Sequence, residues 1–181
     1  FLTMQYITKE IFEKTNVSEE YIKLYYKMHE SEFMAPEMVR ARHILIKADK
    51  SASEDIKKKA YEKIEGILSR IKASADFAKV ADEFSEDGTK GNGGDLGFFP
   101  KGRMVPDFEK VAFSMKKGEV SGIVETQFGY HIVKIEEKKE PAIEPFENVK
   151  DKVREKVLNE FRKARVDEYM EKAMKDAGVE L

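Results

Sequence analysis

Two of the chain's histidines lie in short segments whose alternating apolar residues are typical of β-strands. His43 lies in ARHILIK, where it would share a strand face with Ala41 and Leu45, and His131 lies in GYHIVKI. If the two strands are neighbours in one sheet, both imidazoles face inward and could form a hydrogen-bonding pair at the floor of a cleft. The alternative is two structural histidines whose nitrogens are satisfied in the core, and the pattern leaves both interpretations open.

A glycine-rich segment, FSEDGTKGNGGDLGFF, could present polar groups to such a cleft. A phosphate cradle is disfavoured, because no GK[ST] follows and because Asp87 and Asp95 would repel phosphate. An EF-hand is also a poor fit, because its acids are too few and the final Glu is missing. The segment is therefore either a flexible surface loop or a tight loop that presents Asp87 and Leu96 to a pocket.

Met104 and Phe108 lie four residues apart in KGRMVPDFEKVAF. This spacing is found in ordinary core packing. It also suits the wall of an apolar pocket, because Met and Phe form adaptable apolar surfaces.

The elements that would position these residues lie in a middle segment, 40–137, which holds ten of the eleven glycines and has an α+β pattern. Strands are expected at 41–47, 96–99 and 129–137, with one more after the turn in GEVSG. Helices are expected from a capping box of Ser51 and Glu54 to about residue 72, over 76–84, and from Pro106 onward.

Helices are also expected at both ends of the chain. The first runs from an N-cap at Ser18 to about Phe33. The second begins at Pro145 and would be roughly 48 Å long, with a continuous apolar stripe from Phe146 to Ala177. The middle unit is too small to cover that stripe, so the first helix should meet it, within one chain or between two in a swapped dimer.

The composition excludes several classes of function. Lys and Arg number 33 against 35 Asp and Glu, so no overall basic field exists to hold nucleic acid. The chain has no cysteine, which excludes disulfides and thiolate chemistry, and its histidines lack metal-site spacing. No apolar run approaches the ~20 residues of a membrane span. The opening FLTMQYITKEIF is unlike a signal peptide, and we expect a trimmed form or a piece of a longer protein.

Three segments in order resemble the parvulin family of peptidyl-prolyl cis/trans isomerases: RHILIK, FSEDGTKGNGGDLGFFPKGRMVPDFEKVAF and GEVSGIVETQFGYHIVKI. The flanks YYKMHESEFMAPEMVRARHILI and FENVKDKVREKVLNEF are similar to SurA- and PrsA-like bacterial foldases, which act outside the cytoplasm. The resemblance implies an α+β fold, with a small, mostly antiparallel sheet covered by helices and terminal helices that form a partial chaperone-like module. The expected domains are 1–39, 40–137 and 138–181, with the linker near 138–144.

The resemblance also implies a site. By position, the catalytic residues would be His43, Asp87, Thr126 and His131, and the proline-binding residues would be Leu96, Met104, Phe108 and Phe128. Phe128 departs from the family pattern, since some relatives have serine there. The loop ADKSASEDI offers one lysine among three acids, so we predict no requirement for a phosphorylated residue before proline. Neither a metal nor a cofactor is expected.

The function that the resemblance implies is isomerisation of X-Pro bonds in unfolded or partly folded polypeptides. A second hypothesis is a client-binding chaperone in which isomerase activity is secondary or absent. A third is that the terminal helices only stabilise the middle domain or form a homodimer.

Overall fold

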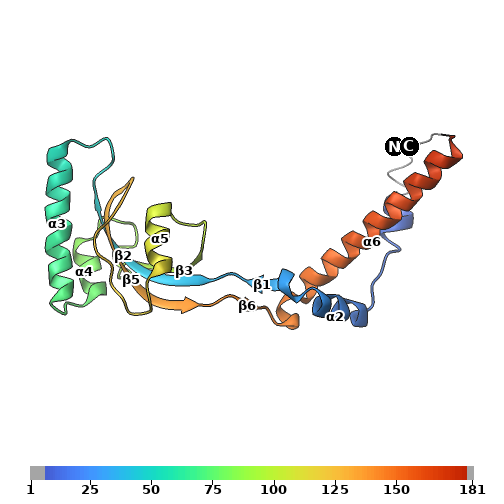
Figure 1. The fold of residues 1–181 in the computed structure, drawn as a ribbon, viewed down its shortest axis with the longest axis horizontal. Helices are drawn as coiled ribbons and strands as arrows, with labels where there is room; N and C mark the ends of the chain where they lie inside the picture. Colours follow the sequence, from blue (N-terminus) through green and yellow to red (C-terminus); the bar gives the residue numbers. More distant parts are fainter. Residues whose placement is uncertain (1–6, 179–181) are drawn as a thin grey trace. The chain divides into compact units, whose positions relative to one another are not determined.

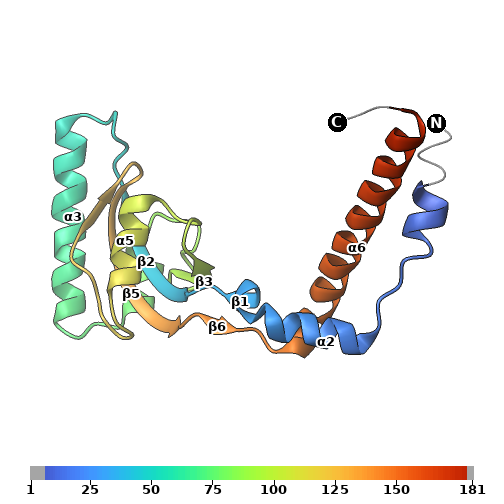
Figure 2. The same ribbon diagram turned by 45° about the vertical axis from the view of Figure 1, so that its right-hand side comes forward.

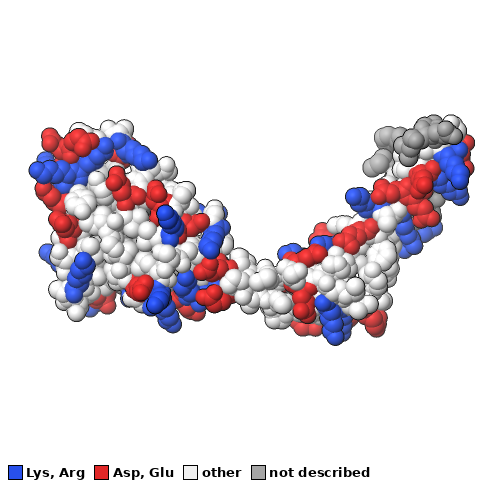
Figure 3. Space-filling model, in the orientation of Figure 1, with Lys and Arg blue, Asp and Glu red and all other residues white. Residues whose placement is uncertain are grey.

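The computed structural model describes residues 7–178, which form two compact units. One unit is Pro36–Ala142, and the other combines the described parts of Phe1–Ala35 and Ile143–Leu181. Charged side chains of both signs are interspersed over the visible face of each unit (Figure 3), in keeping with the near-balanced charge. Among the described residues, no helix is long and apolar enough to cross a membrane.

The first unit is built on a four-stranded sheet with the order β3-β2-β5-β4, in which every neighbouring pair is antiparallel. The strands are β2 (Met38–Lys47), β3 (Asp95–Pro100), β4 (Val124–Thr126) and β5 (Gly129–Lys139). The two longest, β2 and β5, are central (Figure 1). Their alternation places one set of side chains on each face of the sheet.

Helices cover the two faces of this sheet (Figure 2). On one face, α3 (Glu54–Lys72) and α4 (Phe77–Phe84) pack against buried residues such as Ile44 and Ile132. On the other face, α5 (Pro106–Ser114) packs against Ala41 and Val133. His43 and His131 are in step with this second set, so both imidazoles lie on the α5 face. The predicted α+β class, with a small antiparallel sheet covered by helices, is confirmed.

The predicted capping box of Ser51 and Glu54 at the start of α3 is wrong. The N-cap is Ser53, whose hydroxyl accepts a hydrogen bond from the backbone N–H of Ile56. Ser51 is instead held in the preceding turn, where its N–H and hydroxyl both donate to the Asp49 carboxylate. An aspartate two residues upstream competes for the serine and delays the helix.

The role of Ser53 as the N-cap of α3 can be tested directly. Ser53→Ala should lower the free energy of unfolding of the sheet unit by about 1 kcal/mol, because it orphans a backbone donor in the first turn. Ser51→Ala, the matched control, should cost markedly less, because it leaves the helix start intact. Urea unfolding followed by amide NMR signals of β2 and β5 measures both. A larger loss for Ser51→Ala would restore the predicted capping box.

The second unit pairs the two ends of the chain. Its helical elements are η1 (Ile7–Phe12), α2 (Glu19–Met28), η2 (Glu30–Phe33) and α6 (Phe146–Asp176), and its short strands are β1 (Met34–Ala35) and β6 (Ala142–Ile143). Ser18 caps α2 as predicted, but α2 ends at Met28 rather than near Phe33. At that point the backbone N–H of His29 donates a hydrogen bond to the Tyr25 carbonyl oxygen, and the ring Nδ1 lies 2.9 Å from the same oxygen.

The packing of α2 against α6 confirms that the two terminal helices meet. Val149, Val153 and Val157 of α6 are buried with Ile22 and Tyr25 of α2. Beyond Val157 most of the stripe is not buried. The element η1 also packs against α6, but Ala164, Ala173 and Ala177 are exposed. Phe161, the next residue of the stripe, contacts the Tyr21 ring of α2 and is still 38% exposed.

Candidate functional site

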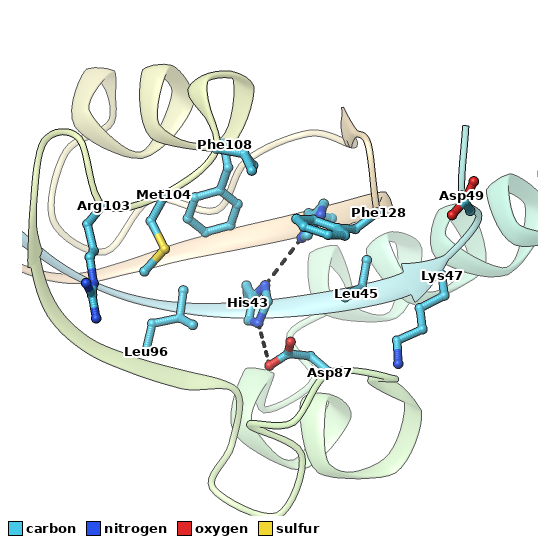
Figure 4. Close-up of a pocket in the computed structure, with 12 residues that line it drawn as sticks. His43, Leu45, Lys47, Asp49, Asp87, Leu96, Arg103, Met104, Phe108 and Phe128 are labelled. Carbon is cyan, nitrogen blue, oxygen red and sulfur yellow. Dashed lines mark hydrogen bonds and ion pairs between the residues drawn. The ribbon is translucent and has the colours of Figure 1, made fainter. Parts of the chain in front are cut away.

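A cavity of about 600 Å³ opens on the α5 face of the sheet (Figure 4). That volume lies within the range usual for small-ligand sites. It is bounded by strands β2, β3 and β5, by the loops that precede α5 and β5, and by α5 itself. Its lining residues are His43, Leu45, Lys47, Asp49, Asp87, Leu96, Arg103, Met104, Val105, Phe108, Phe128 and His131.

The two histidines form a stacked pair at the cavity floor. In the β2–β5 register His43 pairs with Val133 and Leu45 pairs with His131, so the imidazoles are diagonal neighbours on one face. Their Nδ1 atoms lie 3.3 Å apart, and their rings are stacked at 5.5 Å. Phe108 of α5 meets both rings edge to face, and both histidines are about 95% buried.

A chain of polar contacts runs through this pair from Thr126 to Asp87. Thr126 Oγ1 lies 2.8 Å from His131 Nε2 and accepts a hydrogen bond from the Phe128 N–H. At the far end, His43 Nε2 lies 3.0 Å from Asp87 Oδ1, a contact too bent to be a well-formed hydrogen bond. Because an ionised carboxylate can only accept, the chain is satisfied when each group donates toward Asp87. In that order Thr126 donates to His131 and His131 donates to His43, and the Nε2–H of His43 faces the Asp87 carboxylate.

Asp87 is held as a carboxylate. Burial by itself would raise its pKa, but this is outweighed by the hydroxyl and N–H of Thr89, which donate at 2.6 and 2.8 Å, and by His43. The pKa of Asp87 therefore lies well below its usual range. The cavity thus contains a fixed negative charge at neutral pH.

His131 is held neutral. Burial is the main cause that lowers its pKa to about 4; the neighbouring His43 lowers it further, and Asp87 acts in the opposite direction. A neutral His131 has one donor and one acceptor nitrogen, which the order of donors described above requires.

The shifted pKa of His131 predicts acid sensitivity. Between pH 6.5 and pH 4 the unfolded chain binds a proton at this residue that the native state does not, so stability should fall as the pH falls. From about pH 7.5 to about pH 4.5 the parent should lose about 2 kcal/mol more than His131→Gln, which cannot titrate. Urea unfolding followed by amide signals of β2 and β5 measures this difference. Equal losses in both proteins would contradict the neutral assignment, and the contribution of Asp87 appears only at lower pH.

One glycine, Gly94, allows the glycine-rich loop to pack closely against β2. Gly94 has φ +69°, and its carbonyl accepts a hydrogen bond from the His43 N–H at 2.9 Å. A Cβ at this position would lie 2.1 Å from the His43 carbonyl oxygen. The loop that contains Asp87 can therefore approach β2 only because residue 94 lacks a side chain.

The apolar wall comes from β3, α5 and the loop between them. Leu96 lies on β3, Phe108 lies on α5, and Met104 belongs to the connecting loop. The Glu109 carboxylate fastens that loop by accepting hydrogen bonds from the N–H groups of Gly102 and Met104. Met104 is thereby fixed beside Leu96 and Phe108 (Figure 4).

The structure brings seven of the eight residues predicted for the site to the cavity. The exception is Thr126, which is buried behind His131 and contacts the cavity only through that ring. Phe128 lies at the rim and is 51% exposed. The sequence prediction omitted Leu45, Lys47, Asp49, Arg103 and Val105. Strand alternation could have found Leu45, which shares a face with His43, but the others lie on loops or at a strand end, where no periodicity operates.

No cluster of three or more His, Asp or Glu side chains suited to a metal ion occurs within residues 7–178. What the cavity offers is an apolar wall, a neutral buried imidazole and a fixed carboxylate. Such a site can bind an apolar ring next to a polar bond and hold hydrogen-bonding groups around that bond.

Sequence comparison places this site in a known family. The family model of the PPIC-type PPIase domain matches residues 22–139. The foldase protein PrsA of Caldanaerobacter subterraneus subsp. tengcongensis is 38% identical over 99% of this chain and 53% of its own length. PrsA of Geobacillus kaustophilus is 36% identical over 96% of this chain and 56% of its own length. The chain thus spans about half the length of the curated relatives it matches.

Solved structures agree with the fold. A PpiC-type peptidyl-prolyl cis-trans isomerase domain aligns with a TM-score of 0.55 and 28% identity, over 60% of this chain and 96% of that one. A structure described with the SurA-like chaperones PEB4 and Cj1289 of Campylobacter jejuni aligns with a TM-score of 0.60 and 24% identity, over 99% and 70% of the two chains. The resemblance seen in the sequence is confirmed: this chain belongs to the PPIC-type peptidyl-prolyl isomerase family.

Proposed function

We propose that this chain isomerises X-Pro bonds in unfolded or partly folded proteins. The observation that carries the proposal is the apolar cavity wall of Leu96, Met104 and Phe108, which lies beside a buried chain of hydrogen-bonding groups. A cavity of about 600 Å³ accommodates a proline ring with parts of its neighbours. Membership of the isomerase family supports the same activity.

The reaction requires neither a covalent intermediate nor a cofactor. Amide resonance resists rotation by about 18–20 kcal/mol, and the catalyst must bind the twisted amide better than either planar isomer. The apolar wall would hold the pyrrolidine ring and exclude water from it. The rest of the bond would then rotate about the held ring.

The polar residues of the site would weaken the amide resonance of the X-Pro bond. A planar amide has more negative charge on its oxygen than a twisted one, so a carboxylate near that oxygen disfavours the planar forms. Asp87 is the residue suited to this role, since its charge is fixed and it reaches the cavity. His43, His131 and Thr126 would position Asp87 and shape the floor, and they need not exchange protons with the substrate.

We also propose that no phosphate is required on the residue before proline. In the loop after β2, the Asp49 carboxylate is bound to Ser51 and lines the cavity. Together with Asp87 it opposes the binding of a dianion.

Exchange NMR spectroscopy on an Ala-Pro peptide tests both proposals. Substoichiometric protein should accelerate cis/trans exchange, and a phosphoserine-Pro peptide should exchange no faster than Ala-Pro. Absence of acceleration with every peptide would refute the isomerase activity. Acceleration confined to the phosphorylated peptide would refute only the second proposal.

A second candidate function, client binding as a chaperone, is favoured by the outer surface of α2. Leu24 and Met28 are 54% and 71% exposed, and Tyr21 beside them is 43% exposed. Single exposed apolar residues are common, but three on one short helix form a surface for extended apolar segments. Leu24→Ser with Met28→Ser should weaken suppression of aggregation of a proline-poor client and leave Ala-Pro exchange unchanged. Unchanged suppression would argue against this surface.

We propose a location outside the cytoplasm for this protein. Its relatives are foldases, and the resemblance to SurA- and PrsA-like proteins supports a role outside the cytoplasm. A homodimer through the terminal helices is tested by sedimentation at increasing protein concentration. A constant monomer mass would exclude it.

A further inference from the structure

Four charged side chains line the cavity, and they differ in how far they are already paired. The two carboxylates are engaged: Asp49 accepts from Ser51, and Asp87 accepts from Thr89 and contacts His43. The two cations, Lys47 and Arg103, lie toward opposite ends of the cavity (Figure 4).

Arg103 is a cation of this site that has no acidic partner within residues 7–178. It precedes Met104 in the loop before α5, and it is exposed. Within the described part of the chain, no carboxylate lies within 4.0 Å of its guanidinium, and it makes no hydrogen bond and no aromatic contact. Arg40 and Arg42, by contrast, are both paired with Asp95, and Arg42 also contacts Glu136.

Lys47 does not offer an equivalent charge. Glu86 accepts a hydrogen bond from the backbone N–H of Lys47, and the positive charge of Lys47 contributes to lowering the pKa of that carboxyl. Asp49 lines the same end of the cavity. Among the described residues the Lys47 ammonium also has no carboxylate at ion-pair distance, but Glu86 and Asp49 make its surroundings acidic. Arg103 lies at the other end of the cavity, beside Leu96 and Met104 (Figure 4).

We infer that Arg103 selects clients with a carboxylate side chain on a residue next to the proline. This inference rests on the proposed isomerase activity. A ring held against Leu96, Met104 and Phe108 places the adjoining residue within reach of the neighbouring arginine (Figure 4). A guanidinium binds a carboxylate through two parallel hydrogen bonds, which an ammonium cannot do. A singly charged acid suits this site better than a phosphate, since Asp87 and Asp49 repel a dianion more strongly.

The test compares peptides that are identical except beside the proline. Glu, Ala or Lys is placed before the proline in one series and after it in another. Exchange rates and dissociation constants are both measured by NMR. In one of the two series the parent should prefer Glu over Ala by about threefold, the size expected for an exposed ion pair, and the preference should shrink at high salt.

Variants assign the preference to Arg103. Arg103→Gln should abolish it, Arg103→Lys should keep part of it, and Arg103→Glu should make the Lys peptide the better substrate. Lys110→Gln is the matched control, because it removes the same charge from an exposed position on α5 outside the cavity. It should leave the preference unchanged.

The two levels of the proposal fail separately. A parent protein that binds the Glu peptide preferentially but accelerates no exchange would refute the isomerase activity and support the inference. Normal Ala-Pro exchange with no Glu preference, or a preference that survives Arg103→Gln, would refute the inference alone. Failure to bind or turn over any peptide would overturn both.

Discussion

Gly94→Ala is expected to lower the free energy of unfolding of the sheet unit by about 3 kcal/mol or more. The new Cβ would lie 2.1 Å from the His43 carbonyl oxygen, and the backbone must keep φ near +69°. Because residue 94 also accepts the His43 N–H, relief of the clash would pull the loop away from β2 and Asp87 away from the histidines. Isomerase activity should be lost together with stability.

Gly97→Ala is the matched control for this prediction. Gly97 lies three residues further along with φ +67°, but a Cβ there meets nothing within 4 Å. It should cost only the left-handed backbone strain, about 1–2 kcal/mol. Urea unfolding followed by amide signals of β2 and β5 measures both variants. Similar losses at the two positions would show that close packing against His43 is not what requires a glycine.

Phe108→Ala should reduce X-Pro turnover by at least tenfold, the effect of losing about 1.4 kcal/mol of transition-state binding. Phe108 forms the cavity wall above the histidines, and its removal opens the proline pocket to water. The side chain is only 3% exposed and packs on Phe99, so the variant should also lose about 3–5 kcal/mol of stability. Phe108→Leu, which keeps more of the volume, should fold more stably and still turn over more slowly than the parent.

Phe113→Ala is the control that distinguishes loss of the proline pocket from loss of core packing. Phe113 lies on the same helix and also packs on Phe99, but it does not line the cavity. This variant should lose stability and keep turnover per folded molecule. Exchange spectroscopy at a temperature where all the variants are folded makes the comparison. Equal loss of turnover in Phe108→Ala and Phe113→Ala would remove the pocket from the mechanism.

Strand alternation was sufficient to predict the floor of the site. Apolar neighbours two residues away predict that His43 and His131 point inward, and the structure places them as diagonal neighbours whose Nδ1 atoms meet. Two structural features bear on what the pattern left open. The Asp87 contact and the adjacent cavity place the pair at the floor of a cavity, and a catalytic role for the two histidines stays a prediction.

The loops were beyond what periodicity can predict. The position of Arg103 depends on a loop fastened by Glu109, seven residues beyond Gly102, and no local pattern specifies that contact. The predicted N-cap at Ser51 was wrong because the Ser51 hydroxyl donates a hydrogen bond to the Asp49 carboxylate and does not cap α3. The pattern also could not predict how much of α6 is buried, because this depends on where α2 and η1 lie against that helix.

The terminal unit is assembled from segments on either side of the sheet unit, which constrains how the chain is made. During synthesis, Ile22, Tyr25 and Phe33 leave the ribosome long before the valines of α6 that will bury them. The residues between can close their own sheet first, since domains fold as units in the order of their emergence. A nascent copy therefore passes through a period in which its sheet unit is complete while the apolar face of α2 still lacks its intramolecular partner.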